Sequence, residues 1–153
     1  MAETNKVTAE AVQKLREATG AGVMDCRKAL IDAEGDFDRA KAIIAEKGLE
    51  KVEKRAGREA GAGLVESYVH NERIGVLLDI RAETDFVVRS EPFRAMAHDL
   101  AMHIAAAAPE TVDELLAQPY VRDESKTVKD IIGEVIAKTG ENITVNKFFR
   151  LEV

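Results

Sequence analysis

The sequence has no tryptophan and a single cysteine, and only 5% of its 153 residues are aromatic. Aliphatic residues must therefore build the core. One cysteine, Cys26, cannot form a disulfide within the chain, which is typical of a reducing compartment. No apolar run approaches the roughly 20 residues that a membrane-spanning helix needs, and the first residues lack the apolar segment of a secretory signal. We therefore expect a cytoplasmic protein without a membrane partner.

The sequence also lacks an excess of basic charge. Its net charge is −6, and the distribution is uneven. Residues 1–63 carry 12 basic and 12 acidic side chains, whereas residues 64–153 carry 10 basic and 16 acidic ones. A polyanion would be repelled by the acidic second part, so we expect no nucleic-acid partner.

Patterns of known catalytic sites are missing as well. The glycines at 57, 61 and 63 have neither the spacing nor the Lys-Ser/Thr pair of a phosphate-binding loop. His98 and His103 are five residues apart, so they do not share a helix face as a metal-binding pair would. Cys26 could be a reactive thiol, but a small buried hydrophobe is the commoner fate of a lone cysteine. We expect no catalytic residue, no cofactor and no metal site, and hence a protein that is not an enzyme.

Apolar residues at helical spacing indicate three short helices in the first 48 residues. The first runs from a suitable N-cap, Thr8, to Gly20, and the second begins near Val23. The third begins after a further N-cap, Asp36, and is expected to close at Gly48. Each helix is too short to be stable alone, so we expect the three to pack together as one module.

The pattern changes to strand-like alternation after a charged stretch. Leu64–Val69 and Ile74–Arg81 predict a hairpin, and the last run, from residue 143, predicts a third antiparallel strand. Its apolar residues are expected on one side of the sheet, namely Ile143, Val145, Phe149 and Leu151. A long helix is expected after Ser90, a short helical turn around residue 112, and another helix opened by residues 123–125 and closed by Gly140.

The predicted fold class is therefore α+β. We expect a three-helix module at residues 1–48, a charged helical linker at 49–62, and at 63–153 a core in which a small antiparallel sheet packs with helices.

Phe86 is a large apolar residue in the short polar connection between the second predicted strand and the helix that follows. Such connections usually run over the surface. The side chain either folds back into the core or reaches out to a partner, and the residues alone leave both alternatives open. Asp85 before it is expected to shape the turn, a common role of aspartate.

Three motifs closely resemble the bacterial elongation factor Ts family: residues 15–30 (LREATGAGVMDCRKAL), 83–87 (ETDFV) and 140–143 (GENI). The resemblance covers nearly the whole chain. It implies an N-terminal module like a ubiquitin-associated domain, followed by a core of strands and helices. It also implies that the chain binds elongation factor Tu, in its GDP-bound and nucleotide-free forms, and promotes GDP release.

The resemblance assigns the contact beside the nucleotide to Thr84, Asp85, Phe86 and Val87. In the family the Phe enters an apolar pocket of the GTPase, and the movement dislodges the bound Mg²⁺. Where relatives often have Asn-Cys before this motif, the chain has Arg81-Ala82.

The resemblance further implies that Arg16, Val23 and Met24 dock the helical module on the nucleotide-binding domain of the GTPase. Family members usually have two methionines after Gly-Ala-Gly, whereas this chain has Val23 and Met24, which keeps the contact apolar. From the residues alone, Arg16 could equally lie on a solvated helix face, and the two apolar residues could belong to the core of the module.

The chain is short beside many relatives, which carry a second half-core. It resembles members in which two chains pair, so the core is expected to be a dimerisation domain and the chain a possible homodimer. An alternative function is that of a non-catalytic binding scaffold that uses the ubiquitin-associated-like module for other ligands. A scaffold would not need the motif at residues 84–87.

Overall fold

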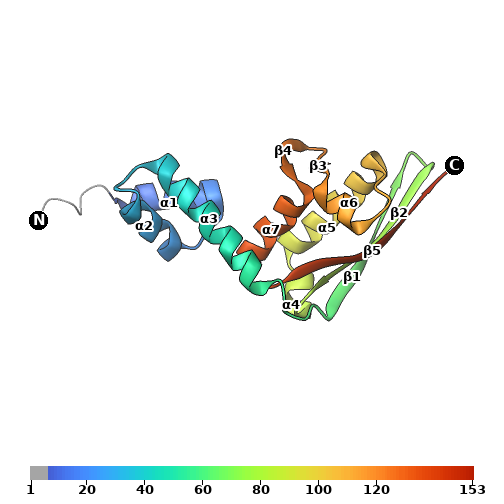
Figure 1. Ribbon diagram of the computed structural model, residues 1–153, viewed down its shortest axis with the longest axis horizontal. Helices are drawn as coiled ribbons and strands as arrows, with labels where there is room; N and C mark the ends of the chain where they lie inside the picture. The colour runs from blue at the N-terminus through green and yellow to red at the C-terminus, as the bar shows by residue number, and fades with distance from the viewer. Residues whose placement is uncertain (1–6) are drawn as a thin grey trace, which may run out of the picture. The chain divides into compact units, whose positions relative to one another are not determined.

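The computed structural model describes residues 7–153, which form two compact units that divide after Lys54. Figure 1 shows the helices of the first unit and the sheet and helices of the second. Within the described residues, no helix is both long and apolar enough to cross a membrane. The mixture of N-terminal helices with a small antiparallel sheet confirms the predicted α+β class.

The first unit contains the helices α1 (Ala9–Thr19), α2 (Val23–Asp32) and most of α3 (Phe37–Arg55). Thr8 caps α1 as predicted, because its hydroxyl accepts from the backbone N–H of Ala11 at 3.1 Å. Small and aliphatic side chains fill the centre of this unit: Val12, Leu15, Cys26, Ala29, Leu30, Ala33 and Ala40. Cys26 is fully buried among them, so its interpretation as a small buried hydrophobe is confirmed.

The predicted end of the third helix at Gly48 is wrong, since α3 continues to Arg55. A glycine lowers helix stability by about 1 kcal/mol, but it does not end a helix unless the backbone turns into the left-handed conformation. Gly20 makes that turn at φ 70°, and Gly48 does not. Two ion pairs also hold α3 against α2, Lys47 with Asp32 at 3.3 Å and Lys51 with Asp25 at 2.8 Å.

The second unit is built on a three-stranded antiparallel sheet of order β1-β2-β5, with β1 at Ala62–His70, β2 at Ile74–Ala82 and β5 at Ile143–Glu152. The predicted hairpin and third strand are confirmed. Helix α5 (Glu91–Ala107) packs on β1 and β2, and α7 (Val128–Thr139) packs against α5. Several side chains of β2 and α5 are fully buried, among them Leu78, Ile80, Phe93, Leu100 and Ile104.

A β-bulge in β5 overturns the predicted alternation of that strand. Ile80 pairs with Val145 and Asp79 pairs with Lys147, so Asn146 is the extra residue. Beyond the bulge the faces exchange, because one inserted residue shifts the two-residue period. Arg150 therefore points to α5 and donates to the carbonyl of Ala105 at 3.0 Å.

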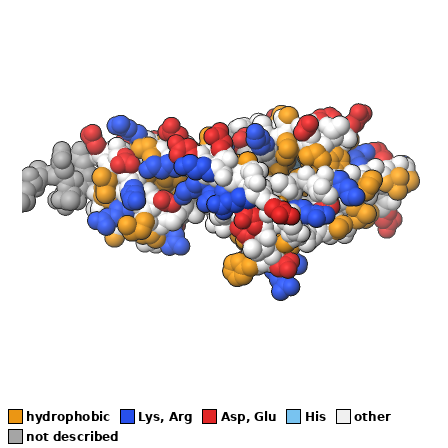
Figure 2. Space-filling model, turned by 60° about the horizontal axis from the view of Figure 1, so that its bottom comes forward, with side chains coloured by type: hydrophobic (Ala, Val, Ile, Leu, Met, Phe, Trp, Pro, Cys, Tyr) orange, Lys and Arg blue, Asp and Glu red, His pale blue; other side chains and the backbone are white. Residues whose placement is uncertain are grey.

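Phe149 and Leu151 consequently lie on the opposite side from Ile143, and they are 67% and 69% exposed. They share the outer face of the sheet with other exposed apolar residues: Val65, Val69 and Leu77. Leu77 pairs directly with Phe149. Figure 2 shows hydrophobic side chains exposed among charged ones toward the end of the unit where these strands end. We name these five residues the open sheet face.

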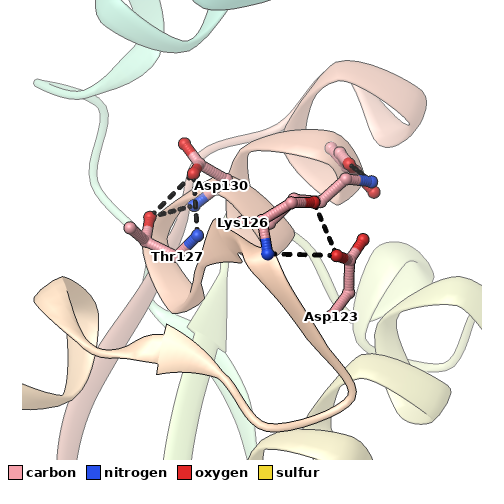
Figure 3. Close-up of polar contacts among 6 residues, drawn as sticks. Asp123, Lys126, Thr127 and Asp130 are labelled. Carbon is pink, nitrogen blue, oxygen red and sulfur yellow. Dashed lines mark hydrogen bonds and ion pairs between the residues drawn. The ribbon is translucent and has the colours of Figure 1, made fainter.

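Helix α7 begins later than predicted, at Val128. Residues 123–127 form a strand, β4 (Asp123–Thr127), which pairs with the two-residue strand β3 (Pro119–Tyr120). Thr127 and Asp130 form a reciprocal capping box (Figure 3), with Asp130 Oδ2 accepting from Thr127 N at 2.8 Å and Thr127 Oγ1 accepting from Asp130 N at 3.2 Å. This pair satisfies two free N–H groups, so the helix starts there. The short helix α6 (Val112–Ala117) was predicted and is confirmed.

The contacts of Asp79 beside the bulge make the stability of the folded protein depend on pH. Asp79 accepts from Arg81 Nε at 2.7 Å and from the bulge residue, through Asn146 Nδ2, at 2.8 Å. The Arg81 hydrogen bond is the chief reason why the pKa of Asp79 falls from its ordinary 3.8 to about 2. A lowered carboxyl pKa stabilises the folded protein above the unfolded pKa, and this contribution disappears as the pH falls from about 4 to 2.

We therefore expect Asp79→Asn to lower the free energy of unfolding by about 1 kcal/mol at pH 7, allowing for solvent screening around Arg81, and by almost nothing at pH 2. Urea unfolding at a series of pH values measures the difference. A difference that stays constant from pH 7 to pH 2 would contradict this account of the bulge.

Candidate functional site

The motif around Phe86 forms a single helical turn, α4 (Asp85–Val88), between β2 and α5. Thr84 is the N-cap of this turn: its backbone is extended, and its hydroxyl accepts from the N–H of Val87 at 3.4 Å. The turn closes where Arg89 N donates to the carbonyl of Asp85 at 3.0 Å. Asp85, as the first residue of the turn, places its negative charge at the positive end of the helix dipole.

Phe86 is 85% exposed, the largest exposure among the large apolar residues of the described chain. Its two neighbours point the other way, since Val87 and Val88 are each 5% exposed. The structure therefore excludes one of the two alternatives that the sequence left open, because Phe86 is not part of the core. Val87 instead anchors the turn, so the motif combines one exposed aromatic ring with a buried apolar side chain next to it.

Two residues from a distant part of the chain hold this turn. Glu141 accepts from the Thr84 hydroxyl at 2.5 Å, and Asn142 donates its backbone N–H to Glu83 Oε1 at 2.7 Å. Sequence reasoning assigned no role to Glu141 or Asn142. Their only signal was the resemblance of residues 140–143 to the family motif, because nothing in local periodicity reports a contact across 57 positions.

Two of the three residues predicted to dock the helical module line one groove of the first unit. Arg16 and Val23 lie in it together with Val12, Gly20 and Arg27, whereas Met24 is not among its lining residues. Val23 is 49% exposed, and its neighbour Met24 is 60% exposed, so neither fills the core of the module. Gly20 permits this arrangement because its left-handed backbone, with φ 70°, ends α1 and lets α2 begin after a short connection.

The histidines of the second unit are engaged in structural contacts. His103 is fully buried, and its Nε2 lies 2.9 Å from Gln118 Oε1 while its Nδ1 accepts from the N–H of Val121 at 3.3 Å. The more exposed His98 lies 3.1 Å from Glu66. Among residues 7–153, no cluster of three or more His, Cys, Asp or Glu side chains could hold a metal ion.

Comparison with known proteins matches the sequence of this chain to one family. The family model described as "Elongation factor TS" matches residues 2–113 and, separately, 83–153. An elongation factor Ts of Alkaliphilus oremlandii is 40% identical over 192 aligned positions, which cover 96% of this chain and 89% of that protein.

Relatives from other bacteria agree. The elongation factor Ts of Caldanaerobacter subterraneus is also 40% identical, over 95% of this chain and 96% of its own length. That of Thermodesulfovibrio yellowstonii is 38% identical, over 96% of each. The chain belongs to the elongation factor Ts family, a family of translation elongation factors.

Proposed function

We propose that this protein is a guanine-nucleotide exchange factor that binds elongation factor Tu in its GDP-bound form and promotes GDP release. The observation that carries the proposal is the presentation of Phe86. A ring that is 85% exposed, on a capped turn whose next two residues are buried, is poised for insertion into another protein. An isolated protein gains nothing from exposing such a ring.

Burial of a phenyl ring at an interface contributes about 2 to 3 kcal/mol. The conformational cost of insertion is small, because the turn that carries Phe86 is already fixed before binding. In the proposed mechanism the ring enters an apolar pocket beside the partner's nucleotide site, and the displacement there disturbs the partner's Mg²⁺. That metal neutralises the phosphates, so weaker coordination lowers the affinity for GDP.

No covalent bond is made or broken in this mechanism, so the chain acts by binding and not as an enzyme. Linkage requires that the effect be reciprocal: a factor that lowers GDP affinity is itself bound less tightly by the GDP form than by the nucleotide-free form. Arg16, Val23 and Met24 supply a second point of attachment through the helical module. Their partly exposed apolar side chains and the charge of Arg16 suit a mixed interface of this kind.

Exchange is tested by stopped-flow release of fluorescent GDP from elongation factor Tu. The wild-type chain is expected to accelerate release, and Phe86→Ala is expected to lose at least about thirty-fold of that acceleration, the usual cost of truncating a central aromatic anchor. Leu49→Ala, which removes another exposed apolar side chain, serves as the matched control and should retain full activity.

Because Phe86 packs so little, Phe86→Ala should leave the urea unfolding midpoint unchanged, so a loss of exchange would not reflect unfolding. If the wild-type chain binds elongation factor Tu without accelerating release, the exchange function is refuted and a scaffold role is favoured. If Phe86→Ala exchanges as fast as wild type, the insertion of the ring is refuted.

We further propose that the active protein is a homodimer that pairs through the open sheet face. Two findings support a second copy as the occupant. The family model matches residues 83–113 in two separate alignments, so this segment is similar to two parts of the family model. The relatives also align over 192 positions although this chain has 153 residues, so they carry a segment that it lacks.

Sedimentation velocity tests the pairing at micromolar concentration. Wild type is expected to sediment as a dimer, and Phe149→Asp as a monomer, because a charge in the middle of an apolar sheet face is not compensated on burial. Val121→Asp, at an exposed apolar position outside the open sheet face, is the control. A wild-type chain that is monomeric and still drives exchange would contradict the proposal.

A further inference from the structure

The turn that carries Phe86 is clamped to the segment before β5 by two hydrogen bonds that run in opposite directions. From the side of the turn, the Thr84 hydroxyl donates to the Glu141 carboxylate, at 2.5 Å from Oε1 and 3.0 Å from Oε2. From the other side, the backbone N–H of Asn142 donates to the Glu83 carboxylate at 2.7 Å.

The bond from Thr84 to Glu141 also orients the cap of α4. A hydroxyl can donate a single hydrogen bond, and here the Thr84 hydroxyl donates it to Glu141. The lone pairs of the oxygen are then directed to the N–H of Val87, which donates to the same atom at 3.4 Å. Without Glu141 the hydroxyl would donate to water, and the Thr84 side chain would lose the contact that holds it in the rotamer that caps the turn.

Glu141 itself stands on a fixed part of the chain. Gly140 ends α7 in the left-handed conformation at φ 77°, with its N–H donating to the carbonyl of Ile136 at 2.9 Å. Asn142 is buried, and its side-chain amide donates to the carbonyl of Arg58 at 2.8 Å. Ile143 then pairs with Ala82 in the sheet. The carboxylate is therefore held between a helix end and a strand start.

The orientation of Phe86 depends on this support because the ring makes little contact of its own. A four-residue helix has no intrinsic stability, so its N-cap and its buried side chains determine its conformation. Val87 and Val88 fix the end of the turn by packing into the core, and Thr84 with Glu141 fixes its start.

We propose that Glu141 is a positioning residue for nucleotide exchange, which holds the Thr84 cap so that Phe86 is presented in a single orientation. The inference rests on the exchange function proposed above. Glu141 acts through Phe86, by accepting a hydrogen bond, and its negative charge as such is not required at the partner.

Two pairs of variants separate these roles in the GDP-release assay. Glu141→Ala removes the acceptor and is expected to slow release about tenfold, whereas Glu141→Gln keeps an acceptor oxygen and should stay close to wild type. Thr84→Val removes the hydroxyl and should match Glu141→Ala, and Thr84→Ser, which keeps the hydroxyl, should protect the Val87 amide of the free protein from hydrogen exchange as wild type does. In the Phe86→Ala background, Glu141→Ala should cause no further loss, since two residues that act as a unit are not additive.

Amide hydrogen exchange on the free protein provides a readout that does not depend on elongation factor Tu. Glu141→Ala should speed exchange of the Val87 amide about tenfold while the buried amides of β2 keep their protection. The inference is overturned if Glu141→Ala leaves both this amide and GDP release unchanged, if Glu141→Gln slows release as much as Glu141→Ala, or if the loss persists in the Phe86→Ala background. If the wild-type chain does not accelerate GDP release from elongation factor Tu, the proposed function fails. Hydrogen exchange of the Val87 amide still decides whether Glu141 holds the turn.

Discussion

The hydroxyl of Thr84 joins three parts of the second unit at one atom. It accepts from the N–H of Val87, donates to Glu141, and thereby connects β2, the turn α4 and the segment between α7 and β5. The exposed ring of Phe86 packs against almost nothing, so its direction depends on the residues that hold the turn. A surface feature can be rigid only if its neighbours are fixed, and here the fixing contacts are polar on one side and apolar, through Val87 and Val88, on the other.

The sheet of the second unit is covered on one face only. One layer of helices covers one face of the sheet and leaves the other face with five apolar side chains in solvent. A bulge at Asn146 produces part of this exposure, since it turns Phe149 and Leu151 outward. An apolar sheet face of this kind is a marker of an interaction surface. The unit thus presents two different surfaces, a single projecting ring and a broad flat patch, which suit different partners.

Much of the fold could be predicted from periodicity and capping, as the hairpin, the helix after Ser90 and the stop at Gly140 illustrate. The errors arose where a local signal lost to a tertiary contact or to a competing cap. Gly48 did not end α3, whose continuation pairs with α2 through Lys51 and Asp25. Asp123 did not open α7, because the capping box at Thr127 was stronger. The bulge at Asn146 could not be foreseen, since it depends on pairing with β2. In the site, the family resemblance located Phe86, but whether the ring was buried required the structure, and the role of Glu141 required a contact between distant residues.

The central claim is that this chain and GDP displace each other from elongation factor Tu. The most direct test is the dissociation constant of the complex, measured by calorimetric titration over a series of GDP concentrations. The affinity should fall as GDP rises, and the factor by which saturating GDP weakens binding of the chain should equal the factor by which the chain weakens binding of GDP. An affinity that is independent of GDP would contradict the account.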